Sequence, residues 1–468
     1  MIKKKKTIAL LLAGAMLASA ALAGCGDSGN ASRENSQGNQ EGQGGQEGRP
    51  EDGSGQEGQP DGSGQAGGEG GTVTMWMHNG PAFVDATKAL AERFQEETGI
   101  SVDIQIFPYD VMSQKMQAAY SAGNEPDIIQ AFGSWLPPYV NQGMLAAVPD
   151  DFAAAFDTDF FEGATEGLKK DGRYYGVPME LQCEYGLFYV PEKVKEAGIE
   201  DGKPDNFEEV VQVGRNAARF NGNVLEYGGL EFDNGDNVAQ LFLSWILQYG
   251  GEFWDESGVH MKLTTEEGQK AWQRLVDLVA VDRVTDLKHV TPELGTDMFF
   301  FNQKAAQLVK GSWASAYEEQ FDFHDWEYCF FPAVEGDIPT FVVETGWTYV
   351  VSENSASKDN AFKFVEFCLR PENAMEFNMA TITIPALKAV AEDPAFTDAK
   401  ENVRFKDQYQ YLKYSRNVGP VQDMDFVKKL VQDTLRGQVD GSYTTESALE
   451  YMETEINKHI DTLLSQAG

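Results

Sequence analysis

Tryptophans with polar neighbours recur at the ends of segments that the sequence predicts to be β-strands. They are Trp76 with His78 and Asn79, Ser134 with Trp135, Trp313, and Trp347. An indole face packs on the apolar C–H face of a ring-shaped ligand, and serine, asparagine and histidine side chains hydrogen-bond its polar edge. These residues are therefore candidates for contacts with a ligand. Core packing is the alternative role for each tryptophan.

The segments that position the first of these residues have the pattern of a parallel sheet. Residues 72–78 and 100–106 alternate apolar and polar side chains, and residues 83–94 between them have helical spacing and stop at Gly99. Strand, helix and strand within such a short distance predict a βαβ unit. A second helix over residues 111–122 leads into a strand over 127–132. Ligands of open α/β sheets collect beyond the carboxyl ends of the strands, where the first tryptophans stand.

Residues 171–191 change character midway. Tyr175 to Glu184 alternate, which predicts an extended segment with one apolar face and one half-exposed polar face that includes Glu180. From Tyr185 to Val190 nearly every side chain is apolar, as in a strand covered on both faces. We expect this segment to cross from one lobe of the protein to another.

Later segments predict further helices and strands. Helices are expected over residues 206–220, 237–249 and 264–279, the last with a capping box from Thr264 to Glu267. Strands are expected over residues 326–332 and 345–351. The two last helices, around residues 427–431 and 449–463, have a strong apolar periodicity that we assign to core packing.

The N-terminus predicts export and membrane anchoring. Lysines 3–6 precede an apolar run that ends in Leu22-Ala23-Gly24-Cys25, which is typical of a bacterial lipoprotein signal over residues 1–24 with lipid attachment at Cys25. An ordinary signal peptide with an incidental cysteine is the alternative. Residues 26–71 contain almost only glycine and polar side chains, so we expect a disordered tether.

Composition excludes several classes of function. The 468 residues carry a formal net charge of −37, which disfavours a nucleic-acid partner and is more typical of a soluble acidic surface. Besides Cys25, the cysteines Cys183, Cys329 and Cys368 are far apart among apolar neighbours, so we expect buried thiols and no disulfide framework. The five histidines are scattered, and the sequence has no common metal, hydrolase or phosphate-binding motif, so no catalytic residue, metal or cofactor is expected.

Several short phrases together resemble the extracellular solute-binding proteins of the family-1 type, the lipoprotein receptors of carbohydrate ABC importers. The matching phrases are Glu97–Val102, Glu125–Ile129, Tyr175–Glu180 with Leu187–Tyr189, Asn302–Ala306 with Gly311–Trp313, and Gly346–Val351 with Asn360–Phe364. They occur in the family's order and span residues 72–468. The resemblance implies an α/β, two-lobe, periplasmic-binding-protein-like type II fold. A sugar would be enclosed in the cleft as the lobes close.

The resemblance also implies roles for particular residues. Glu180 would accept hydrogen bonds from sugar hydroxyls, and Trp313 would stack on a pyranose ring. Ser134 and Trp135 occupy positions where maltose-binding relatives place polar ligands. These two residues, with His78 and Asn79, depart from the maltose-binding pattern, which argues against maltose itself but not against a glycan in general. Arg416, with Asn417, is a further candidate from its loop context, and Trp76 and Trp347 are candidates as strand-end aromatics.

The expected organisation follows from the same resemblance. After the signal (1–24) and the lipidated tether (25–71), the first lobe comprises residues 72–180 and 340–385, and the second comprises residues 181–332 and 386–468 with the C-terminal helices. Within the crossing segment, Tyr175–Met179 would end the first lobe, Glu180–Glu184 would form the hinge, and Tyr185–Val190 would begin the second lobe. The protein would act as a monomer on the outer face of the cell membrane, with the ABC transporter permease as its partner.

Two other functions remain open from the sequence. A polyamine receptor of the same fold is the first, because carboxylates and aromatic rings also bind organic cations. A tethered surface glycoside hydrolase is the second, because 74 acidic residues offer many ways to pair two carboxylates.

Overall fold

The computed structural model describes residues 70–289, 295–337, 339–419 and 421–467. The predicted signal peptide, Cys25 and nearly all of the predicted tether lie outside these residues. Within them, no helix combines the length and the apolar composition that a membrane span requires.

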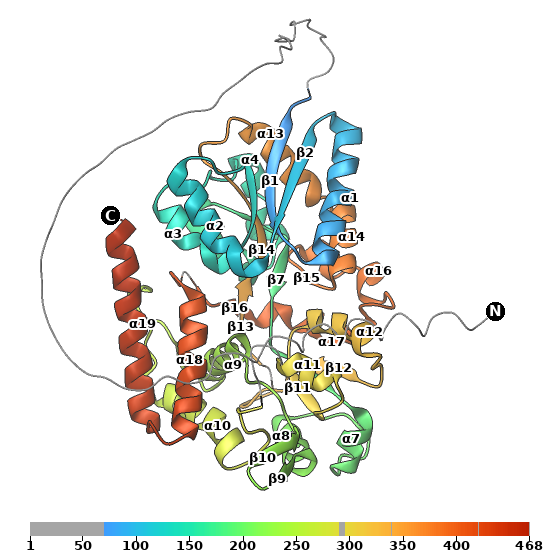
Figure 1. The fold of residues 1–468 in the computed structure, drawn as a ribbon, viewed down its shortest axis with the longest axis vertical. Helices are drawn as coiled ribbons and strands as arrows, with labels where there is room; N and C mark the ends of the chain where they lie inside the picture. Colours follow the sequence, from blue (N-terminus) through green and yellow to red (C-terminus); the bar gives the residue numbers. More distant parts are fainter. Residues whose placement is uncertain (1–69, 290–294, 338, 420, 468) are drawn as a thin grey trace, which may run out of the picture. The chain divides into compact units, whose positions relative to one another are not determined.

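A five-stranded sheet forms the first part of the fold, in the order β2-β1-β3-β14-β6 (Figure 1). Its strands are β1 (Thr72–His78), β2 (Ser101–Phe107), β3 (Ile128–Phe132), β6 (Val177–Pro178) and β14 (Trp347–Val351). β1 pairs in parallel with β2 and β3, and β14 runs antiparallel to β3 and β6. The predicted βαβ unit is therefore confirmed, and a strand from far along the chain continues the sheet.

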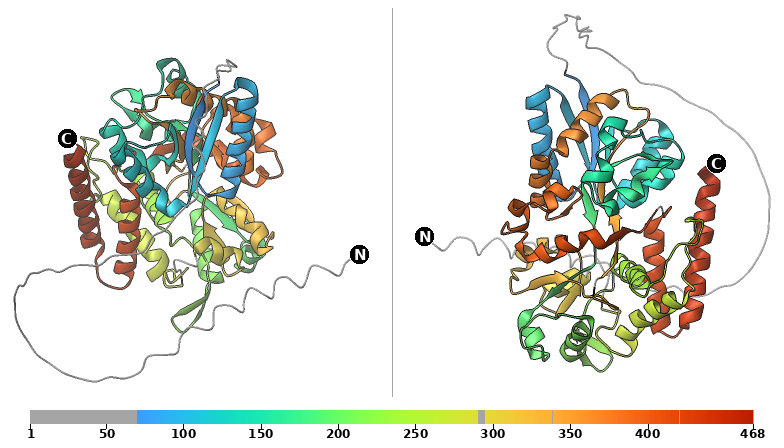
Figure 2. Two further views of the ribbon diagram at one scale, coloured as in Figure 1. Left: turned by 45° about the horizontal axis from the view of Figure 1, so that its top comes forward. Right: turned by 180° about the vertical axis from the view of Figure 1, so that it is seen from behind.

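Helices cover both faces of this sheet (Figures 1 and 2). α1 (Pro81–Thr98), α13 (Lys358–Cys368) and α14 (Pro371–Thr381) lie on one side, and α2 (Tyr109–Ala122) and α3 (Leu136–Asn141) on the other. α1 ends at Gly99, whose φ of 76° is the left-handed conformation that glycine adopts without strain. The inward side chains of β1, at Val73, Met75 and Met77, are fully buried.

A second, antiparallel sheet has the order β11-β8-β12. Its strands are β8 (Gly186–Tyr189), β11 (Gln307–Val309) and β12 (Glu327–Phe330). α8 (Phe207–Ala217), α9 (Gly235–Gln248) and α10 (Glu266–Ala280) follow β8 along the chain, and α9 packs against α10. Cys183, Cys329 and Cys368 are buried free thiols, as predicted.

A four-stranded sheet, β15-β7-β13-β16, contains the segment that links the other two sheets. It consists of β7 (Glu180–Gln182), β13 (Phe341–Thr345), β15 (Ile384–Pro385) and β16 (Ser415–Asn417). Residues 175–191 thus contribute β6, β7 and β8 to three successive sheets. The segment passes from sheet to sheet as three short strands and not as one, and the predicted change from half-exposed to buried surroundings is wrong, because residues 176–181 are already buried.

Three details of the sequence analysis are wrong. The polar face of residues 175–184 is not half-exposed, because Glu180 and Glu184 are only 3% and 1% exposed. The segment 345–351 is two strands, since Gly346 separates β13 from β14. The N-cap of α10 is Thr265, which accepts the backbone N–H of Gly268, and not Thr264.

The C-terminal helices α18 (Met424–Val439) and α19 (Thr445–Ala467) pack side by side, and α18 also packs on α9 and α10. Val427, Leu449 and Met452 are buried, which confirms the core packing predicted for these helices. The remaining helices and paired strands are α4 (Asp150–Ala153), α5 (Phe156–Asp159), α6 (Glu162–Thr165), β4 (Lys169–Lys170), β5 (Arg173–Tyr174), α7 (Pro191–Glu196), β9 (Arg219–Asn221), β10 (Val224–Tyr227), α11 (Thr296–Phe301), α12 (Tyr317–Phe321), α15 (Lys388–Ala391), α16 (Pro394–Thr397) and α17 (Lys406–Tyr411).

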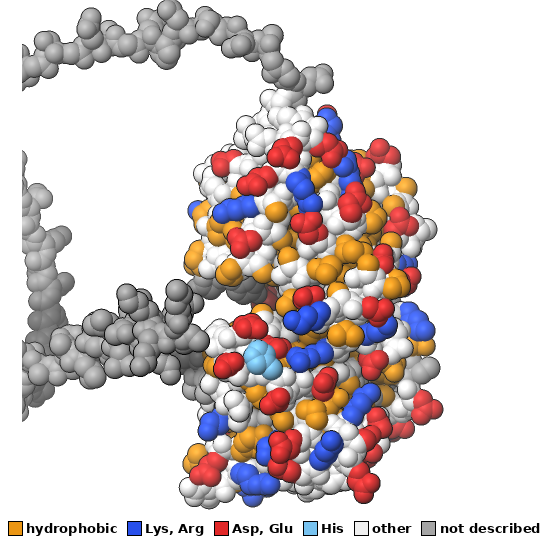
Figure 3. Space-filling view, turned by 90° about the vertical axis from the view of Figure 1, so that its right-hand side faces the viewer, with side chains coloured by type: hydrophobic (Ala, Val, Ile, Leu, Met, Phe, Trp, Pro, Cys, Tyr) orange, Lys and Arg blue, Asp and Glu red, His pale blue; other side chains and the backbone are white. Residues whose placement is uncertain are grey.

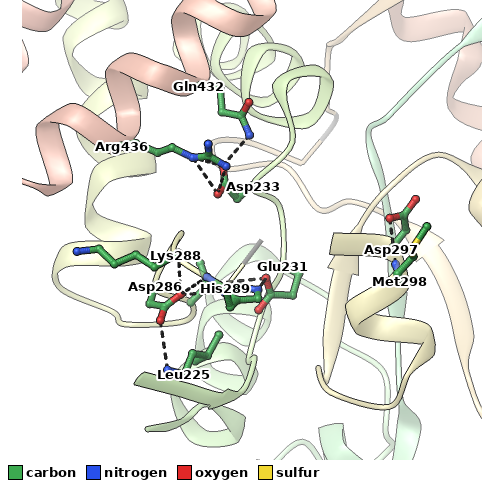
Figure 4. A network of polar contacts seen from close by, with 11 residues as sticks. Leu225, Glu231, Asp233, Asp286, Lys288, His289, Asp297, Met298, Gln432 and Arg436 are labelled. Atoms are coloured by element: carbon green, nitrogen blue, oxygen red, sulfur yellow. Dashed lines mark hydrogen bonds and ion pairs between the residues drawn. The ribbon is translucent and has the colours of Figure 1, made fainter. Parts of the chain in front are cut away.

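Polar contacts connect the segment that contains Glu231 and Asp233 to the loop before residue 290 and to α18 (Figure 4). His289 lies between Glu231 and Asp286. Its Nε2 is 2.8 Å from a carboxylate oxygen of Glu231, and its Nδ1 is 2.8 Å from a carboxylate oxygen of Asp286. Burial acts to lower the pKa of His289, but the two carboxylates raise it to about 9, so the imidazolium persists at neutral pH. Nearby, Asp233 accepts hydrogen bonds from Arg436 and Gln432 of α18. These contacts are structural ties between segments distant in sequence.

The surface over α1, α14 and α12 carries both signs of charge (Figure 3). Acidic and basic side chains are interspersed there, with small apolar areas between them. On this face the acidic side chains do not form one continuous patch.

Candidate ligand-binding site

Five rings gather where β1, β3 and β14 meet, and we call them the aromatic cluster. They are His78, Phe83, Phe132, Trp135 and Trp347. The His78 imidazole stacks on the Trp347 indole with ring centroids 4.0 Å apart and planes inclined by 16°. Phe132 and Trp135 meet Trp347 edge to face at 5.5 and 5.8 Å. The fold therefore brings together three residues that the sequence predicted as ligand contacts, from strand ends about 270 residues apart.

Two polar atoms at this place have no hydrogen-bond partner among the described residues. Burial lowers the pKa of His78 to about 4, so its imidazole is neutral. Its Nδ1 accepts the backbone N–H of Gly80 at 3.0 Å, which leaves Nε2 to carry the proton, unpaired. The hydroxyl oxygen of Ser134 is buried and also unpaired. A buried polar group without a partner is costly, and a ligand hydroxyl would satisfy it.

A groove of about 300 Å³ opens beside Trp135, and we call it the amide groove because five glutamine and asparagine residues line it. It is lined by Ser113, Gln114, Gln117, Ser121, Ser134, Trp135, Pro138, Tyr139, Asn141, Gln142, Met144, Gln422, Asp423, Asp425 and Leu463. These residues come from α2, η1 (Gly133–Trp135) with α3, the start of α18, and α19. Amides, hydroxyls and two carboxylates beside two aromatic rings suit a polar ligand that forms many hydrogen bonds.

Hydrogen bonds join the two walls of the amide groove. The Trp135 indole N–H donates to Asp425 at 3.3 Å, and Asn141 donates to Gln422 at 2.9 Å. Lys170 in turn donates to the Asn141 side-chain oxygen at 2.8 Å. The wall from α3 is thereby connected to the start of α18, so a change at one wall reaches the other.

Glu180 lies in β7, under the start of β14. Its Oε1 accepts the backbone N–H of Trp347 at 3.2 Å, so the predicted hinge carboxylate is in contact with the aromatic cluster through the backbone. A Cβ at Gly346 would come within 2.6 Å of the Glu180 carboxylate, which explains the glycine between β13 and β14. Burial raises the pKa of Glu180 to about 7, against the opposing hydrogen bonds from Trp347 and Thr383.

Trp313 lies in the short helix η3 (Ser312–Ala316) that follows β11, as the predicted strand-end aromatic. It is half-buried, and its indole N–H donates to Glu184 at 2.9 Å. It belongs to neither the aromatic cluster nor the lining of the amide groove.

The other predicted site residues lie elsewhere. Trp76 packs edge to face on Phe107 at 5.0 Å and under the Lys115 ammonium. Arg416 is exposed in β16 and paired with Glu252 at 2.9 Å. Asn79 is exposed at the end of β1, and the neighbour of Arg416, Asn417, is buried and donates to the Gly163 carbonyl at 2.6 Å. These contacts do not join Trp76, Asn79 or Arg416 to the aromatic cluster.

Sequence reasoning missed most of the amide groove. Gln114 and Gln117 are on the exposed face of α2, where a soluble helix carries polar residues for any reason. Gln422 precedes α18 and Asp425 lies in its first turn, and the sequence analysis assigned this helix to core packing. These residues are recognised as groove residues only because they lie near Trp135 in the structure. No local sequence pattern predicts that proximity. Within the described residues, no group of histidine, cysteine and carboxylate side chains is placed to bind a metal ion.

Comparison with known proteins places this geometry in context. The family model described as bacterial extracellular solute-binding protein matches residues 80–375. An arabinooligosaccharide-binding protein of Halalkalibacterium halodurans is 26% identical over 207 residues, which are 44% of this chain and 44% of that protein. The chain thus matches less than half of that relative's length. A maltotriose-binding protein of Pyrococcus abyssi is 22% identical over 345 residues, covering 69% of this chain and 68% of that one.

The fold is shared with solved structures. The cyclic α-maltosyl-1,6-maltose binding protein of Arthrobacter globiformis superposes with a TM-score of 0.71 over 84% of this chain and 99% of its own, at 20% identity. The chain therefore has the α/β, two-lobe fold of maltose-binding-type proteins, as predicted.

Glu180 generates a pH-dependent prediction. Its folded pKa of about 7 lies above the ordinary 4.5, so protonation stabilises the folded protein below pH 4.5, and this stability is lost as the pH rises through 7. Glu180→Gln mimics the protonated form at every pH, so the variant should keep this stability as the pH rises. Between pH 5 and 8, the free energy of unfolding of the wild type should fall relative to the variant by about 2–3 kcal/mol. Urea denaturation measures this difference.

The control is Glu446→Gln, which removes an exposed carboxylate at the start of α19. It should keep the pH dependence of the wild type. Equal pH dependence of the wild type and Glu180→Gln would show that the Glu180 carboxyl does not titrate near neutral pH.

Proposed function

The chain belongs to the bacterial extracellular solute-binding protein family, and from this we propose that it captures a carbohydrate, an oligosaccharide, and delivers it to an ABC importer. The observation that supports the proposal best is the position of Trp135. This ring belongs both to the aromatic cluster and to the amide groove. A sugar ring offers apolar C–H faces and hydroxyl edges, and the two halves of this site offer aromatic faces and amide groups.

The relatives support an oligosaccharide, and the groove has room for part of one. A volume of about 300 Å³ is at the lower end of the range typical of small-molecule sites, ~300–1,000 Å³. A longer glycan would extend from the groove toward Trp313 and Glu180. We propose these two residues as further ligand contacts beside the segment that links the sheets. The named ligands of the two curated relatives and of the structural neighbour are all glycans of this kind.

We propose binding without turnover. Retaining and inverting glycosidases need two carboxyl groups that flank the scissile bond, one of them free to protonate it. In the amide groove, Asp425 already accepts the Trp135 indole and Asp423 accepts from His459 at 3.0 Å. Relatives named as binding proteins agree with this proposal.

The two lobes and the anchor complete the proposal. We assign residues 72–180 and 340–385 to the first lobe, and residues 181–332 and 386–468 to the second, with the hinge at Glu180–Glu184. Ligand that contacts both lobes favours the closed form, which the permease recognises. Lipid at Cys25 would keep the receptor, as a monomer, beside its importer on the outer face of the membrane.

A panel of ligands tests the function. Calorimetry with arabinotriose, maltotriose and cyclic α-maltosyl-1,6-maltose should give saturable binding of at least one glycan, and none of the polyamine spermidine. Trp135→Ala and Glu180→Ala should each weaken that binding about tenfold, because each removes a central ligand contact. Tyr451→Ala, which removes an exposed ring outside the groove, should not.

Tight spermidine binding without glycan binding would replace the proposal with the polyamine receptor. Release of shorter sugars from any panel glycan would establish a hydrolase. If Glu180→Ala binds the glycan like the wild type, the cleft does not include Glu180.

Lobe closure makes a separate prediction. Small-angle scattering should show a smaller radius of gyration when the residue 70–468 body is saturated with the binding glycan. An unchanged radius with a tightly bound glycan would contradict closure. Spermidine at the same concentration is the control for a general effect of added solute.

Membrane anchoring is tested through Cys25. The full-length chain expressed in a Gram-positive host should sediment with membranes and incorporate radiolabelled palmitate. Cys25→Ala should incorporate none and appear in the medium or as unprocessed precursor, whereas Cys183→Ala should behave like the wild type. Palmitate in the Cys25→Ala protein would refute the lipobox.

A further inference from the structure

The Glu184 carboxylate is almost completely buried, with 1% of the residue exposed. Its Oε1 accepts the indole N–H of Trp313 at 2.9 Å, and its Oε2 accepts the backbone N–H of Gly311 at 3.2 Å. Asn237 donates to Oε2 as well, at 3.3 Å. Because both oxygens are engaged, the carboxylate cannot rotate without breaking several bonds, and the indole is attached to a fixed group.

Lys310 completes the environment of the ring. Its Nζ lies 3.4 Å from Glu184 Oε2 and 3.1 Å from the Asn237 side-chain oxygen. The same nitrogen is 4.9 Å from the centroid of the Trp313 ring. Burial acts to lower the pKa of Lys310, but the carboxylates near it, Glu184 first, raise it, so the ammonium is retained. The indole is thus held at its N–H edge by an acceptor and at its face by a cation.

The backbone at Gly311 allows this arrangement. A Cβ there would lie 2.6 Å from the Cys183 carbonyl oxygen and 2.8 Å from the Trp313 ring. Only glycine lets the chain turn so close to both groups. Trp313 itself is half-buried, so part of its surface remains in contact with solvent.

We propose that Glu184 is a positioning residue that holds the Trp313 indole in one orientation before ligand arrives, so that its exposed surface is ready to stack on a sugar ring. The inference rests on the proposed function for its ligand, although the fixed ring itself does not require a ligand. A side chain that is already immobile loses no rotamer freedom on binding, which improves affinity. Glu184 also ends the proposed hinge, so the ring is tied to the segment that crosses between the lobes.

The first test needs no sugar. In ¹⁵N-labelled protein, the Trp313 indole resonance is identified by its loss in Trp313→Phe, and its hydrogen exchange is measured. Glu184→Gln should speed this exchange at least about tenfold, because an amide has one acceptor oxygen and presents N–H groups to the other donors. Glu344→Gln is the matched control, since it also removes a buried carboxylate paired with a lysine, Lys428, but does not contact Trp313.

An unchanged exchange rate in Glu184→Gln overturns the proposal. If this variant does not fold, because Lys310 loses its counter-charge, the double variant Glu184→Gln/Lys310→Met removes both charges together and gives the same measurement.

The second test is a double-mutant cycle on affinity, with whichever glycan of the panel binds the wild type. Glu184→Gln should weaken binding about 3- to 10-fold in the wild-type background, and less than about twofold in the Trp313→Phe background. An equal loss in both backgrounds would show that Glu184 acts on stability or closure and not through Trp313.

The two tests separate the failure of this inference from that of the proposed function. If no panel glycan binds, the proposed function fails, and the exchange rate alone decides whether Glu184 fixes the ring. If glycan binds and Trp313→Phe and Trp313→Ala both leave the affinity unchanged, the function stands and the role given to Glu184 is wrong.

Discussion

Taking a carboxylate out of water is costly unless hydrogen bonds or an opposite charge replace its hydration. Three glutamates on the crossing segments are nearly completely buried, and each is compensated by groups from a distant segment. Glu180 accepts the Trp347 backbone N–H, Glu184 accepts Trp313 beside Lys310, and Glu344 contacts Gln240 and Lys428. These contacts join β7, β13, α9 and α18, so charge compensation constrains the region between the sheets in addition to apolar packing.

The same compensation determines where the candidate ligand contacts stand. Trp347 begins β14 immediately after the residue whose missing side chain makes room for Glu180. Trp313 follows the strand whose next residue, Lys310, neutralises Glu184. Both indoles are therefore attached to the crossing segment, one through its backbone and one through its side chain. A ligand that contacts either ring would act on the segment that we propose as the hinge between the lobes.

Sequence periodicity predicted the parts of the fold that are local. The βαβ unit and the C-terminal helices follow from spacing alone, and the strand-end positions of Trp135 and Trp347 follow from the sheet. The burial of Glu184 could not be predicted, because the alternation of residues 175–184 is also that of a half-exposed strand. Its partners Lys310 and Trp313 lie over 120 residues away. The amide groove was missed for the same reason: α2, α3, α18, α19 and the short η1 all supply it, and polar residues on the exposed face of a helix such as α2 need no explanation beyond solvent.

Charge compensation also bears on which ligand class the site favours. A polyamine receptor needs carboxylates whose charge is free to meet an ammonium group. Here Glu184, Glu344 and Asp233 are already paired with Lys310, Lys428 and Arg436. Glu180 has its pKa raised to about 7 by burial, so it carries only part of a charge at neutral pH. A partly protonated carboxyl both donates and accepts hydrogen bonds, which suits sugar hydroxyls and gives a cation little attraction. Because these buried carboxyl groups offer little free charge, they favour a neutral glycan over a polyamine.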